Sequence, residues 1–304
     1  MKGAWDKMSL TKYEILIKTA ECGSFTRAAE KLNFTQSGIS HAVSSLEEEL
    51  GTKLVVRSHG GVSLTADGRE LLPYFSRMCA LQHQLEQKAQ DLRGLNTGLV
   101  KVAAFTSVYE KWMPGIVKSF SEMYPQIKFD LLPSNINSQI EKWVRDGDAD
   151  CGFVSLPTAE EHLDCWLLQR DQWKAIVACD HPLANKVPFP PKAFEQYPVI
   201  MLDEGDDYEI NRVFDMLNVK PNIQYSVQQD PTILAMVSSG LGISLTNELM
   251  LQRCAYPLVA RDLPQRFYRN IGICVKDKNA MSLSTQRFID HVRRWVALYG
   301  GLDS

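Results

Sequence analysis

The sequence has few cysteines, and none of them lie close together. The seven thiols stand at positions 22, 79, 151, 165, 179, 254 and 274, and they form no C-x-x-C motif and no short cluster with histidine. This spacing excludes a local zinc or dithiol motif and is typical of reduced, mostly buried thiols in a cytosolic protein. We therefore expect no metal site and no closely spaced cysteine pair after residue 98.

Long apolar runs are also missing. The first ten residues, MKGAWDKMSL, lack the apolar core of a secretory signal. No stretch approaches the length of a membrane span. We expect a cytoplasmic protein without a membrane partner.

Motifs of the common enzyme classes are absent. The sequence contains no nucleophile elbow G-x-S-x-G, no phosphate-binding G-x-G-x-x-G and no histidines with metal-ligand spacing. We therefore expect no catalytic residues, no cofactor and no enzymatic activity. An enzyme or a plain solute-binding protein built on an α/β fold is the competing hypothesis.

An excess of positive charge is lacking too. With 33 Lys and Arg against 36 Asp and Glu, the net charge of −3 gives no general attraction to nucleic acid. A DNA-binding segment in this chain must therefore place its few cations well. The length of 304 residues suits two or three domains.

What the sequence does contain is a helix-turn-helix pattern at residues 25–44. Ser24 and Thr35 are placed to cap two short helices, and Asn33-Phe34 makes the turn between them. Apolar residues recur at helical spacing, so one face of each helix packs inward. The outer face of the second helix carries small hydrogen-bonding side chains suited to reading base edges in a major groove, namely Thr35, Gln36, Ser37, Ser40, His41 and Ser44.

Two strand-like segments, 53–57 and 62–64, follow this pattern and surround a glycine-containing turn. They predict a hairpin that forms the wing of a winged helix-turn-helix domain over residues 8–65. Arg57 and His59 on this hairpin are placed to reach phosphate groups or the minor groove. For Arg57, a surface salt bridge is the alternative.

This stretch and its flanks resemble the LysR-type transcriptional regulators. The resemblance rests on an ordered set of residues: Gly23-Ser24-Phe25, Ala28-Ala29, Leu32, Gln36, Ser40, Leu46-Glu47-Glu48-Glu49-Leu50-Gly51, Leu54, Arg57, Leu64-Thr65 and Gly68. The sequence departs from the family pattern where Ser37-Gly38 replaces a usual proline and His41 replaces a usual basic residue. The resemblance implies an α+β multidomain regulator of double-stranded promoter DNA. Its parts would be a winged domain, a long linker helix and a two-lobed α/β effector domain like the type 2 periplasmic-binding proteins.

Residues 66–94 are predicted to form one long linker helix that begins after a capping Thr65. Apolar residues repeat at seven-residue spacing on one face, which is the pattern of helices that pair with a second subunit. An amphipathic helix that lies on its own domain is the alternative. The predicted contacts of a homodimer or homotetramer are Leu71, Phe75, Met78, Leu85 and Leu92.

From residue 99 the pattern changes to short apolar strands alternating with helices, which predicts an α/β effector domain over 99–304. Strands are expected at 99–105, 128–132, 150–155, 173–179, 198–202, 223–227, 242–245 and 270–275, and helices at 113–123, 138–146, 207–217, 231–239, 246–253 and 284–299. The resemblance implies that 99–168 and 267–304 form lobe I and that 170–265 forms lobe II. The chain would cross between the lobes near 169–172 and 263–267.

A ligand in such a fold binds between the lobes, at the ends of strands and the starts of helices. The hydrogen-bonding side chains predicted there are Thr106, Ser107, Ser134, Asn135, Ser155, Asp203, Gln229 and Asp230. Helix capping alone is the alternative for the hydroxyl groups, and a solvated loop is the alternative for the acidic run that starts at Asp203. The effector is a small molecule of open identity, and RNA polymerase is a further candidate partner. A redox-responsive regulator of the same family is the alternative function.

Overall fold

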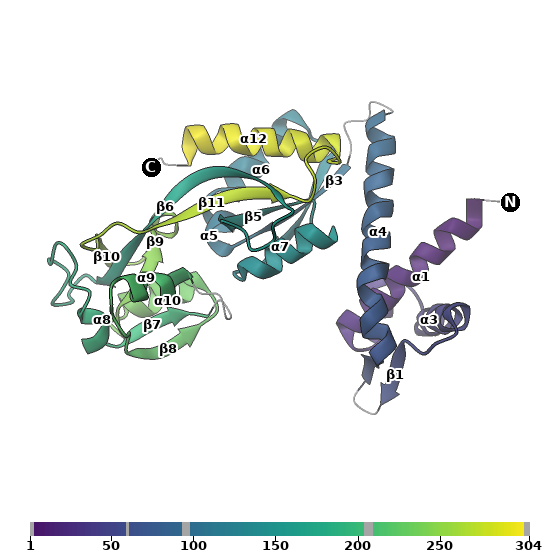
Figure 1. Ribbon diagram of the computed structural model, residues 1–304, viewed down its shortest axis with the longest axis horizontal. Coiled ribbons are helices and arrows are strands. Elements are labelled where there is room, and N and C mark those ends of the chain that lie inside the picture. The colour runs from purple at the N-terminus through teal and green to yellow at the C-terminus, as the bar shows by residue number, and fades with distance from the viewer. Residues whose placement is uncertain (1–2, 59–60, 93–97, 204–208, 301–304) are drawn as a thin grey trace. The chain divides into compact units, whose positions relative to one another are not determined.

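The structure is a computed structural model that describes residues 3–58, 61–92, 98–203 and 209–300 (Figure 1). The chain divides into two compact units, one with residues 1–89 and 146–148 and the other with residues 90–145 and 149–304. Two predicted site positions are affected by these limits. His59 and the side chain of Leu92 lie outside the described residues.

The first unit combines helices with a two-stranded antiparallel hairpin. In chain order its elements are α1 (Gly3–Cys22), α2 (Phe25–Leu32), α3 (Gln36–Leu50), β1 (Val55–Ser58), β2 (Gly61–Leu64) and α4 (Ala66–Leu92). The first of these helices, α1, begins at Gly3 and ends at Cys22.

The apolar faces of α1, α2 and α3 pack into one core. Leu16, Ala28 and Ile39 are fully buried in it. Both predicted caps are confirmed, because Ser24 Oγ accepts a hydrogen bond from the Arg27 N–H (3.4 Å) and Thr35 Oγ1 accepts one from the Gly38 N–H (3.1 Å). These local bonds set the starts of α2 and α3 and so fix the direction of α3.

The long helix α4 shares its first turns with the winged core. Phe75 is 5% exposed, and its ring stacks on Tyr13 with centroids 4.9 Å apart. The assignment of Phe75 to a dimer contact is therefore wrong, since its side chain is buried inside its own domain, and Leu71 packs partly against the same core. Further along the helix, Met78 is 47% exposed and Leu85 is 63% exposed.

A mixed sheet runs through the second unit. In spatial order its strands are β10 (Leu258–Arg261), β6 (Asp164–Ala178), β11 (Tyr268–Val275), β5 (Cys151–Leu156), β3 (Gly98–Ala104) and β4 (Ile127–Pro133), and β9 (Ser244–Asn247) also pairs with β6. β3 is parallel to β4 and β5, whereas β11 is antiparallel to β5 and β6. A separate parallel pair is formed by β7 (Val199–Leu202) and β8 (Ile223–Val227).

The described residues of the second unit form three apolar cores, one in lobe I and two in lobe II. Phe120, Phe153 and Phe288 belong to the core of lobe I. One core of lobe II is built around Phe189, Phe194 and Phe214, and the other contains Ile200 and Ile233. β6 and β11 run side by side from one lobe to the other (Figure 1). The helices are α5 (Thr106–Lys111), α6 (Met113–Met123), α7 (Asn137–Asp146), α8 (Ala193–Gln196), α9 (Glu209–Met216), α10 (Asp230–Ser238), α11 (Glu248–Leu251) and α12 (Leu283–Tyr299). The predicted fold class, a helix-turn-helix domain followed by a two-lobed α/β domain, is confirmed.

The strand β6 is the main difference from the predicted elements. The sequence pattern predicts a strand only from Trp173, because 169–172 is polar, but β6 begins at Asp164. Its polar residues Asp171 and Gln172 are buried and hydrogen-bonded to distant side chains, which burial of a polar group requires. The pattern also misses α5, α8 and β10, and the helix predicted at 246–253 shortens to α11 because β9 continues to Asn247.

Candidate functional site

The outer face of α3 carries most of the predicted DNA-reading side chains. Gln36, Ser37 and His41 are exposed in its first two turns, and the capping Thr35 stands just before them. Ser40 and Ser44 are half-buried. A helix with an exposed row of donors and acceptors fits the major groove of DNA.

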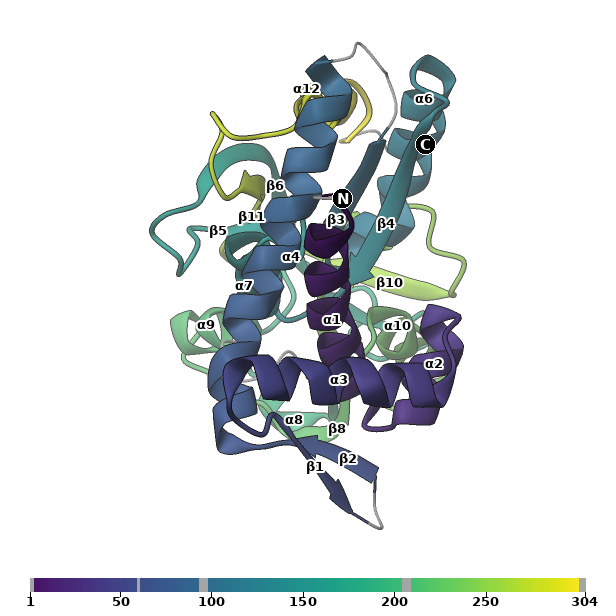
Figure 2. The same cartoon turned by 90° about the vertical axis from the view of Figure 1, so that its right-hand side faces the viewer.

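Arg57 connects the wing to this helix. Its Nη2 donates a hydrogen bond to Ser40 Oγ (2.8 Å), and its guanidinium lies 4.7 Å from the centroid of the Phe25 ring. Figure 2 shows the β1–β2 hairpin beside α3. Arg57 is exposed and held in place by these two contacts, so it presents a fixed positive charge next to the exposed polar row of α3.

Glu47 ties α3 to the wing from inside the domain. Its side chain accepts hydrogen bonds from the backbone N–H groups of Leu54 (2.9 Å) and Val55 (3.2 Å). Lys53 pairs with the same carboxylate at 2.7 Å. Burial alone would raise the pKa of Glu47, but the hydrogen bonds and the charge of Lys53 outweigh burial and lower the pKa.

A small cavity of about 30 Å³ lies between the two lobes of the second unit. Its volume suits one or two water molecules, so a larger ligand must move the lobes apart. Four of the predicted effector residues line it together with four that the sequence pattern does not predict: Ser107, Asn135, Ser155 and Asp230, then Phe105, Asn137, Glu209 and Arg269.

Direct side-chain contacts hold the lobes together at this cavity. Asn135 of lobe I donates from Nδ2 to the Gln228 carbonyl (3.2 Å) and to Asp230 Oδ2 (3.5 Å), both in lobe II. Its Oδ1 accepts hydrogen bonds from the N–H and the hydroxyl of Thr106, each at 2.9 Å. Ser155 Oγ donates to Glu209 across the same gap. A ligand that enters must replace these contacts.

Arg269 is the buried cation of the cavity. Its Nη2 donates to Asp171 Oδ2 (2.6 Å) and to Ser107 Oγ (3.1 Å), and the guanidinium lies 4.4 Å from the centroid of the Phe105 ring. On the opposite lobe, burial raises the pKa of Asp230, although the charge of Arg269 opposes this shift. The cavity therefore presents opposite charges on facing walls.

Four predicted effector residues do not line the cavity, and one of them, Thr106, instead bonds Asn135 beside it. Ser134 Oγ instead accepts a hydrogen bond from the Ile136 N–H (3.1 Å). Gln229 is exposed at the N-cap position of α10 and makes no side-chain cap bond. Asp203 follows β7, and its N–H donates to the Val227 carbonyl (2.6 Å). For Ser134, a hydrogen bond within the local turn describes the side chain better than the predicted contact to an effector.

The cysteines include one pair that the sequence spacing conceals. Cys165 of β6 lies directly opposite Cys274 of β11, although the two are far apart in the sequence. Antiparallel pairing brings together residues far apart in the sequence. A hydrogen bond between the two thiols lowers the pKa of Cys165 and raises that of Cys274. Both are free thiols.

In the described part of the chain, no group of three or more His, Cys, Asp or Glu side chains is arranged to hold a metal ion. Nor does this part of the chain contain a helix long and apolar enough to cross a membrane.

Two family models match successive parts of the chain. The one described as bacterial regulatory helix-turn-helix protein, lysR family, matches residues 10–69. The one described as LysR substrate binding domain matches residues 93–297, which is more than half of the chain. The matched ranges follow the order of the winged and the two-lobed domains.

Individual proteins show the same similarity. YvbU of Bacillus subtilis (strain 168), an uncharacterized HTH-type transcriptional regulator, is 28% identical over 93% of this chain and 97% of its own. The HTH-type transcriptional activator CmpR of Synechocystis sp. is 25% identical over 93% of this chain and 94% of its own. The crystal structure of CbnR complexed with its target DNA shares the fold, with a TM-score of 0.70 at 18% identity, covering 94% of this chain and 99% of that one. The chain belongs to the LysR family of transcriptional regulators and combines a DNA-binding domain with an effector-binding domain.

Proposed function

We propose that the first turns of α3 read the operator in the major groove. Gln36 suits a bidentate contact to adenine, and the exposed Ser37 and His41 extend the row of hydrogen-bonding groups. Arg57, with His59 two residues further along the chain, contacts the flanking phosphates. The observation that supports this assignment most directly is the exposed row of polar side chains on α3. Thr35, Ser40 and Ser44 lie at the margins of this row.

The helix α4 pairs with α4 of a second subunit in this proposal. Met78 and Leu85 are exposed by 47% and 63%, and Leu81 between them is exposed by 67%. Large apolar side chains gathered on one helix favour burial against a partner. Leu92 continues the seven-residue spacing of Met78 and Leu85. Two joined winged domains suit an inverted-repeat operator with half-sites about one helical turn apart.

The effector in this proposal is a small zwitterion of the amino-acid type. Glu209 and Asp230 of lobe II face the cavity with carboxyl groups, and Arg269 faces it with a guanidinium. A ligand with an ammonium group and a carboxylate would complement both walls. It would also take over hydrogen bonds that Asn135 and Ser155 now make to the other lobe.

Ligand binding and lobe arrangement are coupled through those bonds. The cavity of about 30 Å³ is too small for an amino acid, so binding requires a different lobe arrangement. A ligand that prefers one arrangement shifts the population toward it, and one without such a preference shifts nothing. The lobe arrangement would then set the response at the promoter, including any contact with RNA polymerase.

Calorimetry on Ser155→Ala tests the effector site, with a ligand chosen by screening amino acids for thermal stabilisation of the wild-type chain. The variant should bind about 1–3 kcal/mol more weakly, because a polar group of the ligand loses its buried partner. Ser134→Ala is the matched control, since Ser134 does not line the cavity, and it should bind like the wild type. An equal loss of affinity in Ser155→Ala and Ser134→Ala would contradict a zwitterion site. So would a screen in which no amino acid stabilises the wild-type chain against heat.

A further inference from the structure

The lining of the interlobe cavity holds more negative than positive charge. Among the described residues, it contains the carboxylates of Glu209 and Asp230 and the guanidinium of Arg269. Arg269 Nη2 also lies 2.6 Å from Asp171 Oδ2, so its positive charge is already matched in part by a carboxylate outside the lining. A zwitterion brings a single ammonium group, which leaves one carboxylate of the lining without a cation.

Both carboxylates of the lining bond to neutral groups. Asp230 Oδ2 accepts a hydrogen bond from Asn135 Nδ2 (3.5 Å). Glu209 accepts one from Ser155 Oγ. Within the described residues, neither carboxylate forms an ion pair. A bound ligand encloses these groups, and an enclosed charge is costly unless an opposite charge meets it. Each carboxylate is therefore a site for a positively charged group of the effector.

Asp230 is the carboxylate that interacts with Arg269. Burial raises the pKa of Asp230, and the positive charge of Arg269 opposes that rise, so the two groups are close enough to interact. The ammonium and the carboxylate of an α-amino acid are attached to the same carbon atom and need two such neighbouring groups. Glu209 belongs to a different helix, α9, and contacts Ser155 of β5. It is therefore left for another part of the ligand.

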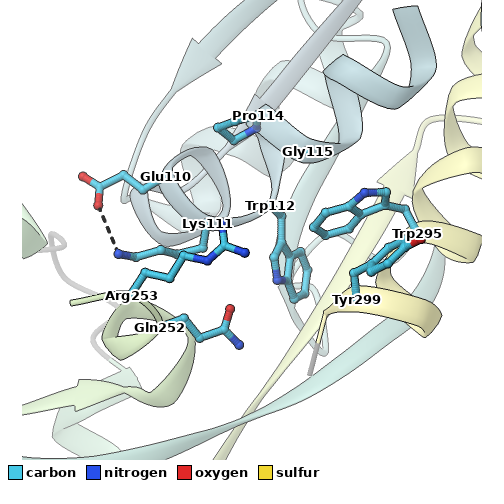
Figure 3. A pocket seen from close by; sticks show the side chains of 9 residues that line it. All are labelled: Glu110, Lys111, Trp112, Pro114, Gly115, Gln252, Arg253, Trp295 and Tyr299. Atoms are coloured by element: carbon cyan, nitrogen blue, oxygen red, sulfur yellow. Dashed lines mark ion pairs between the residues drawn. The ribbon is translucent and has the colours of Figure 1, made fainter. Parts of the chain in front are cut away.

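Charged residues of the neighbouring helix α5 do not supply the cation that Glu209 lacks. The negative charge of Glu110 adds to the burial that raises the pKa of Asp230. The Lys111 Nζ lies 3.9 Å from Glu110 Oε2, so these two charges offset each other (Figure 3). Neither residue lines the interlobe cavity. A cation that meets Glu209 would therefore come from the ligand.

We infer that the effector is a basic α-amino acid, and that its side-chain cation pairs with Glu209. Its carboxylate meets Arg269 and its α-ammonium meets Asp230, so each charge of the ligand faces an opposite charge. The inference rests on the zwitterion site proposed above and adds the chemical class of the ligand side chain. An ammonium and a guanidinium side chain share this chemistry, since both are positively charged and donate hydrogen bonds to a carboxylate.

The side-chain cation would also act on a contact between the lobes. Ser155 Oγ of lobe I donates to Glu209 of lobe II. A cation on Glu209 competes with this hydroxyl group, whereas a neutral side chain offers the carboxylate no replacement donor. A basic amino acid therefore favours a different lobe arrangement more strongly than a neutral one does.

Calorimetry on the full-length chain tests the inference with matched pairs of amino acids. The pairs are L-ornithine with L-norleucine, L-lysine with L-homonorleucine and L-arginine with L-citrulline, and within each pair the side chains are similar in shape but only the first is charged. In at least one pair, the basic member should bind at least about tenfold more tightly, because it alone pairs with Glu209. Cadaverine, which is lysine without its carboxylate, should bind more weakly than lysine.

Glu209→Gln is the decisive variant. Glutamine keeps the size of the side chain and an oxygen that can accept the Ser155 hydroxyl, but it removes the negative charge. The preference for the basic member should therefore fall to near one, while the neutral member keeps its affinity and so reports an intact fold. Asp215→Asn is the matched control, since Asp215 is exposed on the same helix and does not line the cavity. It should keep the preference of the wild type.

The outcomes separate this inference from the zwitterion site itself. Amino acids that bind with equal affinity within all three pairs would overturn the basic side chain and leave the zwitterion site standing. A preference that is the same in Glu209→Gln and the wild type would overturn the pairing with Glu209. Cadaverine binding as tightly as lysine, or no binding by any amino acid, would contradict the zwitterion site and the inference with it.

Discussion

Glu47 shows how one buried carboxylate can hold a recognition helix in place. It accepts the backbone N–H groups of Leu54 and Val55, so its loss leaves two donors of the wing without their acceptor. Glu47→Ala should lower the unfolding free energy of the winged unit by about 1–3 kcal/mol at neutral pH. It should also speed hydrogen exchange at Leu54 and Val55, which mass spectrometry of the full chain can measure.

The stabilisation of the winged unit by Glu47 should decrease as pH falls. Because the pKa of Glu47 is lowered in the folded state, its stabilising effect is present above the ordinary glutamate pKa and disappears as pH falls through the folded-state pKa. The difference between wild type and Glu47→Ala should therefore shrink below about pH 4. Glu48→Ala, at an exposed neighbouring position, is the control and should differ little from wild type at any pH. A Glu47→Ala difference that stays constant down to acid pH would contradict this account.

At the scale of elements, α4 has two parts with different surroundings. Phe75 anchors its first turns in the winged core, whereas Met78 and Leu85 lie on its exposed part. Leu85→Glu should place an unpaired charge in an apolar contact between subunits and release monomers. Light scattering measures the expected fall in mass.

A matched variant separates the contact face from the helix as a whole. Gln87→Glu adds the same charge two residues further along α4, about 200° around the helix from position 85. It should leave the oligomer intact. An unchanged mass for Leu85→Glu, or equal dissociation in both variants, would show that the subunits do not meet at this face of α4.

Elements set by local chemistry could be predicted from the sequence, and those set by distant pairing could not. The caps at Ser24 and Thr35 act within three residues, so the sequence pattern locates α2 and α3 correctly. Arg269 and Asp171 meet across 98 positions of sequence, and neither belongs to a recognisable motif. The sequence therefore predicts only half of the residues that line the cavity. Its hydroxyl and amide groups follow strand ends, whereas its buried cation depends on the register of β6 and β11.

The whole molecule separates DNA recognition from ligand recognition. The winged unit presents a fixed row of polar side chains supported by Arg57 and Glu47. The two-lobed unit offers a charged cavity between its lobes. In the proposed dimer, the ligand-binding lobes and the DNA-reading helices are joined within each chain by α4. Ligands would then change transcription by altering how two winged domains meet one operator.

The most direct test of this account compares operator specificity in Gln36→Ala and Arg57→Ala across several salt concentrations. Gln36→Ala should reduce the difference in binding free energy between operator DNA and random DNA by about 1–3 kcal/mol, because it removes a contact to a base. Arg57→Ala should weaken binding to both DNAs about equally and reduce the salt slope by about one, because it removes a contact to phosphate. A ratio of operator to random-DNA affinity that is the same in Gln36→Ala and wild type would contradict base reading by α3.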